Sequence, residues 1–462
     1  MTHISKLASL RRREFLKRAS AVSVAGAAAP WALQLATIGE AAAAAAPGDY
    51  KAIVCLFMYG GNDYGNTVVP YDAASYQAYA TIRQALATPR EQLAATALTP
   101  SAALPDGRQM ALAPTMTRLK PVFDAGRLAV MLNIGPLIQP TTLAQYKAGN
   151  VPLPPKLFSH NDQSSLWQSS KPEGATTGWG GRVADQFLSS NGNATFSCIN
   201  VSGNAVFMSG GQAVQYQVST GGAVAVNGAT RALFGSNACA EALKGLITGD
   251  RQHWMEQELN RVTARSINAQ GIVSTALANT TLQTPFETNG LAAQLQLVAR
   301  LIGSRAALGA QRQVYFVSVG GFDLHDNLMA QHPGLLGTVA NAMASFDAAL
   351  GELGIAQNVT TFTASDFGRT LSSNGDGSDH GWGSHHLVMG GAVKGGRFYG
   401  QLPSVSVNGP DDVGQGRLLP TTSVDQLAAT LALWMGVSPT DLPTVLPGIV
   451  NFNQKDLGLF AA

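Results

Sequence analysis

Acidic and histidine side chains follow several apolar runs of this sequence, in positions where they could bind a divalent metal ion. Asp63 follows one such run, and Asp323 and His325 follow a second. Asp366 follows a third run, three residues before Arg369. Carboxylate oxygens and imidazole nitrogens together suit zinc, manganese or another divalent ion, whereas softer metals would require thiolates. Acidic residues beside glycine are also common in turns, but their recurrence in a chain with 13% charged residues favours a metal or catalytic site.

A histidine-rich segment, residues 378–386, extends this candidate zone. It ends in the adjacent pair His385 and His386, just before another apolar run. Neighbouring residues of a strand point to opposite faces of a sheet, so we expect at most one of this pair to face a site. Five of the eight histidines could lie near the zone: His160, His325, His380, His385 and His386.

The apolar runs themselves predict strands of a sheet that is covered on both faces. They comprise residues 53–58, 128–132, 314–319 and 359–363. Their apolarity is continuous rather than alternating, which is typical of parallel sheets. Amphipathic helices are predicted over residues 291–308, 336–353 and 424–435. Together these elements predict a three-layer α/β/α fold with a mostly parallel sheet, in which ligands bind at the carboxyl ends of the strands.

Residues 187–285 differ from the rest of the chain in composition. The part from 196 to 235 is rich in Gly, Ser, Val and Asn and predicts short strands and turns, whereas residues 240–277 show a helical pattern. We interpret this region as an inserted cap on the main sheet. No linker rich in Pro or Ser separates domains, so residues 47–462 are predicted to form a single domain.

The charge distribution excludes a nucleic-acid-binding surface. The chain carries a formal charge of +2, and six of its cations lie in residues 1–46. The remainder has more acidic than basic side chains, so it offers no basic surface for a phosphate backbone. The three cysteines leave one pairing open: a Cys198–Cys239 bridge, with Cys55 buried in a strand.

The first 46 residues resemble a twin-arginine export signal and its cleavage region. Arg12 and Arg13 form the pair, Phe15-Leu16-Lys17 completes the motif, and a weakly apolar stretch leads to the alanine run at 41–46. The alternative is an ordinary amphipathic first helix. We expect export by the twin-arginine translocase, a periplasmic or secreted mature protein, and no membrane span, because no other run approaches ~20 apolar residues.

Several motifs occur in one order along the chain and together resemble a known family. They are the twin-arginine leader, Gly60-Gly61-Asn62-Asp63, Gly320-Gly321-Phe322-Asp323-Leu324-His325, Ser365-Asp366-Phe367-Gly368-Arg369-Thr370 and Asp379-His380-Gly381. The set resembles the bacterial family catalogued as domain of unknown function fifteen-oh-one. That family is similar in fold to the alkaline phosphatase and sulfatase superfamily, which implies an alkaline-phosphatase-like fold here.

The resemblance also implies a centre with two divalent metal ions, with zinc or manganese favoured and magnesium or calcium as alternatives. Two ions would clamp the attacking and leaving oxygens of a phosphate or sulfate ester, and Arg369 would bind a non-bridging oxygen. The Asp-Leu-His spacing at 323–325 is tighter than the Asp-x-x-x-His of alkaline phosphatases. The implied ligands are Asp63, Asp323, His325, Asp366 and His380, with Asp379 or His385 as further candidates.

The superfamily also requires a nucleophile at the start of a helix. The candidates include Ser159 and Ser164 in the polar segment 159–165, which could equally be a helix cap followed by a polar first turn. Cys55 lies within a strand, and no sulfatase-type cysteine motif is present.

Two functions follow. One is a periplasmic metal-dependent hydrolase that acts on small anionic phosphate or sulfate esters. The other is a non-catalytic exported protein that binds a metal ion or an anion on the same fold.

Overall fold

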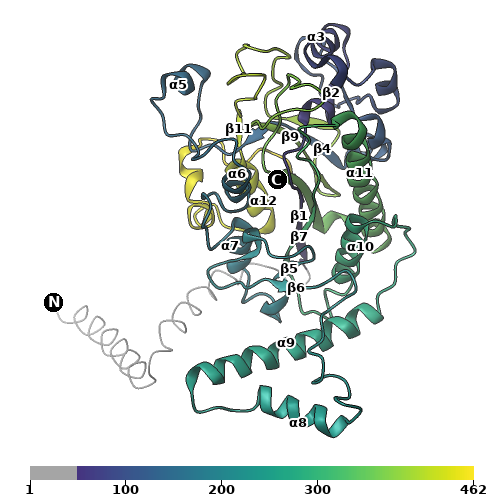
Figure 1. Cartoon of the computed structure of the whole chain (residues 1–462), viewed down its shortest axis with the longest axis vertical. Coiled ribbons are helices and arrows are strands. Elements are labelled where there is room, and N and C mark those ends of the chain that lie inside the picture. The colour runs from purple at the N-terminus through teal and green to yellow at the C-terminus, as the bar shows by residue number, and fades with distance from the viewer. Residues whose placement is uncertain (1–48, 462) are drawn as a thin grey trace, which may run out of the picture. The chain divides into compact units, whose positions relative to one another are not determined.

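A nine-stranded sheet forms the centre of the computed structural model, which describes residues 49–461 (Figure 1). Its strands are β1 (Lys51–Met58), β4 (Leu128–Gly135), β5 (Cys198–Asn200), β6 (Tyr216–Gln217), β7 (Arg312–Val319), β8 (Val359–Ser365), β9 (Ser384–Gly390), β10 (Arg397–Tyr399) and β11 (Thr422–Ser423). A separate pair consists of β2 (Val68–Pro70) and β3 (Met110–Leu112). The predicted leader lies outside the described residues.

The sheet is parallel except at one strand. The order is β10-β4-β9-β8-β1-β7-β5-β6, and β11 pairs with β4. The strand β9 runs antiparallel to both of its neighbours, β4 and β8, whereas the other pairs are parallel. The prediction of a mostly parallel sheet is therefore confirmed. The reversal of β9 brings its amino-terminal end to the edge at which the parallel strands end.

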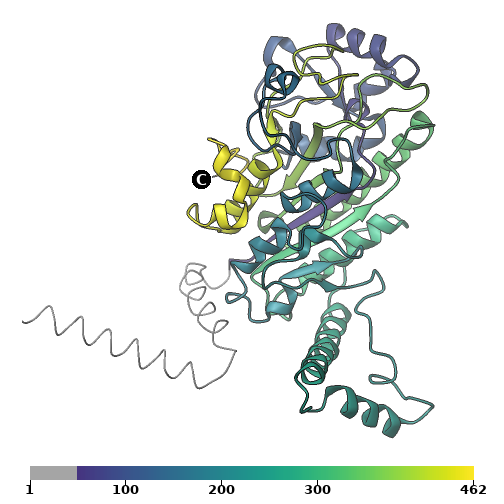
Figure 2. The same ribbon diagram turned by 60° about the vertical axis from the view of Figure 1, so that its left-hand side comes forward.

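Helices cover both faces of this sheet (Figures 1 and 2). The helices of the described residues, not all of which cover the sheet, are α3 (Ala73–Arg83), α4 (Lys120–Asp124), α5 (Leu143–Ala148), α6 (His160–Ser169), α7 (Trp179–Asp185), α8 (Asn237–Thr248), α9 (Trp254–Ala278), α10 (Gly290–Gly303), α11 (Leu328–Glu352), α12 (Val424–Met435) and α13 (Leu442–Val445). Three predicted helices correspond to α10, α11 and α12.

The side chains of β1 show why three layers form. Val54 and Leu56 belong to the core cluster shared with α10 and α11, whereas Ile53, Cys55 and Phe57 belong to the cluster shared with α7 and α12. Successive residues of a strand point to opposite faces, so a continuous apolar strand requires apolar cover on both sides. The three-layer α/β/α prediction is confirmed.

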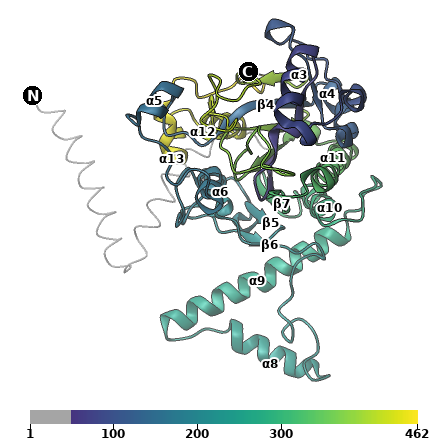
Figure 3. The same cartoon turned by 45° about the horizontal axis from the view of Figure 1, so that its top comes forward.

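The region predicted as an inserted cap, residues 187–285, has two structural parts. Its Gly- and Ser-rich part contributes β5 and β6, which extend the main sheet in parallel beyond β7. These strands are only three and two residues long. Apolar patterns of this length do not show that a strand belongs to the main sheet, so the sequence predicted a cap instead. Its helical part forms α8 and α9, which extend away from the sheet (Figure 3).

The described residues also bear on the cysteine pairing and on the prediction that no helix spans a membrane. Cys198 is buried, Cys239 is exposed and neither is bridged, so the open Cys198–Cys239 pairing is not formed. None of the helices in residues 49–461 combines the length and the apolar character needed to cross a bilayer.

Candidate metal centre

Side chains from three distant parts of the chain converge beyond the carboxyl ends of β7 and β8. Asp323 lies in the loop after β7, and Asp366 comes directly after β8. His380 lies in the loop that leads into β9, which starts at this edge because β9 is reversed. His160 is the first residue of α6.

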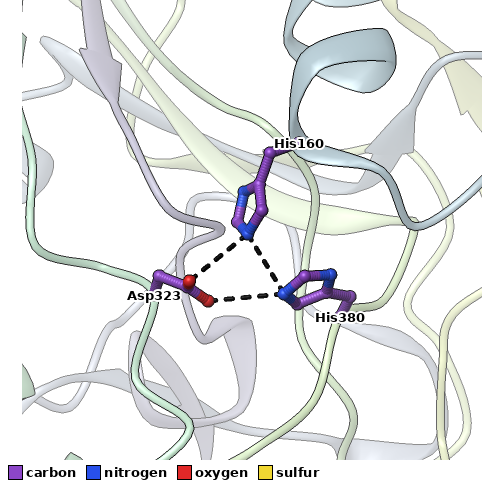
Figure 4. Close-up of side chains that lie close together, drawn as sticks. All are labelled: His160, Asp323 and His380. Atoms are coloured by element: carbon purple, nitrogen blue, oxygen red, sulfur yellow. Dashed lines mark hydrogen bonds and ion pairs between the residues drawn. The ribbon is translucent and has the colours of Figure 1, made fainter.

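His160, Asp323 and His380 point toward one another (Figure 4). The Nε2 atoms of the two histidines lie 3.1 Å apart. Each of these atoms lies 3.4 Å from a carboxylate oxygen of Asp323. One ligand atom from each residue lies within 4.8 Å of those of the other two. A third of the His160 side chain and nearly half of that of Asp323 remain exposed, so the group is open to solvent.

His325 extends this group on one side. Its Nε2 atom lies 2.9 Å from His380 Nε2 and 3.2 Å from an oxygen of Asp323. Three imidazole Nε2 atoms therefore face one carboxylate. We call these four candidate ligands, His160, Asp323, His325 and His380, the metal-ligand cluster.

The other ring nitrogen of each histidine is held by an oxygen acceptor. His160 Nδ1 lies 2.6 Å from Asp366 Oδ2, and His325 Nδ1 lies 3.2 Å from Asp379 Oδ1. His380 Nδ1 lies 2.8 Å from the main-chain oxygen of Phe158. These acceptors favour the tautomer with hydrogen on Nδ1, which leaves the Nε2 lone pair free to bind a metal ion.

The spacing of His160, Asp323 and His380 fits a small divalent ion. Ligand atoms of a tetrahedral zinc ion, with bonds of about 2.0–2.1 Å, lie about 3.3 Å from one another. The distances from Asp323 to the three histidines are 3.2–3.4 Å. Nitrogen and oxygen donors in this proportion suit zinc or manganese.

Neighbouring groups shift the pKa values of His160 and His380 in opposite directions. The hydrogen bond that His160 donates to Asp366 raises the pKa of His160 above its ordinary value. Burial lowers the pKa of His380, which favours its neutral, metal-binding form. Burial acts to raise the pKa of Asp323, but the hydrogen bond and charge of Arg369 outweigh it and lower that pKa, which keeps the carboxylate ionised.

Arg369 lies beneath Asp323 rather than in contact with solvent. Its side chain is fully buried, and its Nη1 donates to Asp323 Oδ1 at 2.7 Å and to the main-chain oxygen of Gly60 at 3.0 Å. Its Nη2 donates to the main-chain oxygen of Ser378. The predicted contact of Arg369 with a substrate oxygen is corrected accordingly: the guanidinium is used within the protein and fixes Asp323.

Asp366 and Asp379 were also predicted to bind a metal ion. In the structure each of them instead contacts the Nδ1 atom of a histidine. Asp366 Oδ2 also accepts the main-chain N–H of Gly60 at 3.0 Å, which connects the end of β1 to the end of β8. Asp366 Oδ1 is buried with no hydrogen-bond partner. The structure therefore assigns these two carboxylates to the orientation of His160 and His325.

Asp63 and His385 are separated from the cluster by their partners. Asp63 forms a buried ion pair with Arg83 at 2.9 Å and accepts a hydrogen bond from Ser378. Burial acts to raise the pKa of Asp63, but the charge of Arg83 outweighs it and the pKa is lowered. His385 is buried, and its Nδ1 accepts the main-chain N–H of Asn133. The guanidinium of Arg83 takes the place of the metal ion predicted beside Asp63.

The two candidate nucleophiles differ in their surroundings. Ser159 precedes His160 at the start of α6, and its hydroxyl donates to Asp162 Oδ2 at 2.9 Å. Ser164 lies one turn into the helix, and its hydroxyl donates to the main-chain oxygen of His160 at 2.6 Å. Ser159 therefore has a carboxylate that could accept its proton, whereas Ser164 is bonded within the helix.

Sequence reasoning assigned no metal-binding role to His160 and did not identify Arg417. His160 lies in the polar segment 159–165, and its placement among five candidate histidines was the available signal. Arg417 donates through Nε to the main-chain oxygen of His380 at 2.6 Å, and its guanidinium stacks 5.1 Å from the ring centre of Phe158. No local pattern marks this arginine, because it reaches the site from a loop between β10 and β11.

The family model described as a protein of unknown function, DUF1501, matches residues 50–448. The chain belongs to the DUF1501 family. This DUF1501 protein has no match among curated proteins. Among solved structures it is similar to the PsFucS1 sulfatase from Pseudoalteromonas sp., with 10% identity, a TM-score of 0.34, and coverage of 86% of this chain and 70% of the sulfatase. It is also similar to the lipoteichoic acid synthase LtaP from Listeria monocytogenes, with 6% identity, a TM-score of 0.34, and coverage of 90% and 81%.

Proposed function

We propose that this DUF1501 protein is an exported metal-dependent hydrolase of small anionic esters of phosphate or sulfate. The observation that supports it most is the convergence of three imidazole Nε2 atoms on one solvent-exposed carboxylate, each imidazole held by a separate acceptor at Nδ1. Ligands oriented in this way are typical of catalytic metal sites that retain an open coordination position.

We propose one divalent ion, held by His160, Asp323 and His380, with His325 as a fourth ligand. When bound, the ion supplies Lewis-acid stabilisation of charge on an ester oxygen. The number differs from the two ions expected from the sequence, since Asp63 is already neutralised by Arg83.

Residues around the cluster are proposed to supply the nucleophile, to bind the anionic group of the substrate and to orient Asp323. Ser159 is the proposed nucleophile: its oxygen would bond to the phosphorus or sulfur as the bond to the leaving alcohol oxygen breaks, and Asp162, which accepts its hydrogen bond, would take the hydroxyl proton and pass it to that leaving oxygen. Water would then cleave the bond to Ser159 and release phosphate or sulfate. Arg417, half-buried beside His380, supplies positive charge for the anionic group of the substrate in place of the buried Arg369. Arg369 keeps the Asp323 carboxylate oriented.

One observation favours a second candidate, a non-catalytic metal- or anion-binding protein. The hydroxyls of Ser159 and Ser164 both donate hydrogen bonds within α6, and neither is directed at the metal-ligand cluster by a contact. This arrangement would suit a protein that binds an ion without forming a covalent intermediate.

The test begins with metal content. We expect the purified protein to hold close to one equivalent of zinc or manganese, and His160→Ala to lose it while remaining folded. Aryl phosphate, aryl phosphodiester and aryl sulfate substrates are then assayed with zinc, manganese, magnesium and calcium. Ser159→Ala should abolish turnover and retain the metal, whereas Ser164→Ala should retain both. A metal-loaded protein that hydrolyses none of these substrates would support the binding protein instead.

A further inference from the structure

An apolar stripe runs along the full length of α9 at coiled-coil spacing. Its residues are separated alternately by four and three positions: Met255, Leu259, Val262, Ser266, Ala269, Val273 and Ala276. This alternation keeps the residues on one side of a helix and is the spacing of a helix–helix seam. Six of the seven positions are apolar, so the stripe is built to be covered along its whole length.

Only the carboxyl-terminal half of this stripe is covered by the rest of the described chain. Ala269, Val273 and Ala276 are buried in the core cluster that includes α10. In contrast, Met255 is 59% exposed, Leu259 65% and Val262 43%. Buried and exposed residues therefore belong to one continuous helix face. Scattered exposed apolar residues are ordinary on protein surfaces, but three in register on one helix face form a patch that suits a partner.

The partner cannot be α8, because α8 packs on the opposite side of α9. Asn260, which lies on the side of the helix away from the stripe, donates through Nδ2 to the main-chain oxygens of Gly249 and Leu246, at 2.5 and 3.3 Å. The exposed half of the stripe therefore faces away from the helix that accompanies it.

We propose that the exposed half of the α9 stripe binds a second copy of this chain, with the two α9 helices antiparallel. In this arrangement Leu259 of one copy packs against Val262 of the other. The two-fold axis repeats the contact, so it occurs twice at the interface. The same alignment places Glu258 of each copy near Arg265 of the other, in the positions that flank a helix–helix seam. Both side chains are exposed, and neither has an ion-pair partner among the salt bridges of the described residues.

The exposed half of the stripe borders a groove of the same chain. A cavity of about 310 Å³ lies between α9 and the edge of the sheet, and its lining includes Val262 and Arg265 of α9 together with Tyr216 of β6. Trp254, the first residue of α9, is 74% exposed. In the antiparallel alignment, Trp254 of one copy lies level with Ile267 of the other, so the contact extends over residues 254–267 of both helices.

The experiment measures the oligomeric state of the purified protein by sedimentation equilibrium. We expect a dimer, and we expect Leu259→Glu to convert it to a folded monomer. Glu258→Arg and Arg265→Glu each create like charges at two sites, so each should raise the dissociation constant about tenfold or more. The double variant exchanges the two charges and should restore dimerisation. Glu241→Arg, an exposed charge reversal on α8, is the matched control and should leave the dimer unchanged.

Three outcomes would overturn the proposal. A monomeric wild-type protein at all accessible concentrations excludes the second copy as the occupant. A monomer that floats with phosphatidylglycerol vesicles and loses this property in Leu259→Glu would assign the stripe to a membrane surface. A dimer that is insensitive to Leu259→Glu and to both charge reversals would place the interface elsewhere. None of these measurements depends on metal content or hydrolysis, so their failure is distinct from that of the proposed function.

Discussion

The carboxylates of Asp366 and Asp379 show how residues that do not bind the ion can determine whether it binds. Each holds the Nδ1 atom of a histidine whose Nε2 atom faces Asp323. Without that acceptor an imidazole can rotate or change tautomer, and the ligand atom is lost from the cluster. The two carboxylates therefore position histidines, although the sequence motifs alone would assign them as metal ligands.

Replacing Asp366 tests this role. We expect Asp366→Asn to lower zinc affinity about 10–100-fold, because the amide holds His160 less strongly than the carboxylate does. The fold should persist, since an amide oxygen can still accept the main-chain N–H of Gly60. Metal titration and thermal unfolding measure the two effects. Asp326→Asn, an exposed residue of the same loop as His325, is the control and should change neither.

His386 carries a separate prediction on acid stability. Burial lowers the pKa of this histidine to about 3, and its neighbours are Thr363 and the ring of Trp167. In the unfolded chain the imidazole binds a proton near its ordinary pKa of about 6.5, whereas in the folded chain it stays neutral. The unfolded state therefore binds more protons as the pH falls, and stability decreases from about pH 6.5 toward pH 3.

We expect His386→Asn to remove its share of this dependence, about 1.4 kcal/mol per pH unit between roughly pH 6 and pH 4. Denaturant unfolding in the presence of a chelator measures it without a contribution from metal loss. The same slope in the variant and in the wild type would show that His386 titrates normally in the folded protein.

At the scale of elements, the metal-ligand cluster depends on a close approach between two loops. Gly60 follows β1 with a φ of +117°, and a Cβ at this position would lie 2.2 Å from the main-chain nitrogen of Asp323. The loops after β1 and β7 can meet only because this residue has no side chain. Backbone conformation after one strand thus determines the position of a ligand after another.

Gly60→Ala should therefore displace the Asp323 loop. We expect a stability loss of about 2–4 kcal/mol, from the left-handed backbone conformation together with the steric overlap, and a large fall in metal content. Gly126 has a φ of +72°, and a Cβ added there would meet no atom within 4 Å, so Gly126→Ala isolates the conformational cost. If the two variants lose equal stability and both retain metal, the close approach is not what positions Asp323.

At the scale of the whole molecule, the leader and the α9 stripe predict where the protein acts and with what partner. Replacing Arg12 and Arg13 by lysine keeps the charge but removes the pair that the twin-arginine receptor recognises. We expect the precursor to remain in the cytoplasm, as measured by cell fractionation, while Arg11→Lys is exported. Normal periplasmic yield of the double variant would contradict the export proposal.

The sequence determined the layers of the fold and the edge at which chemistry is located. Continuous apolar runs can be satisfied only when a strand is covered on both faces, so residues 53–58 and 314–319 already specified a buried parallel sheet. Parallel strands end at one edge, so the polar residues that follow them, such as Asp323 and Asp366, were expected to gather there. These inferences depend only on short-range order along the chain.

The tertiary structure alone decided the role of each polar residue at that edge. His160 joins Asp323 from a helix start far earlier in the chain, Arg83 neutralises Asp63, and Arg369 is turned inward beneath Asp323. The partner of a charged side chain is set by the packing of segments that are far apart in sequence, and no local pattern records it. For the same reason, the α9 stripe reads as uniform in the sequence, and only the fold shows which half is covered.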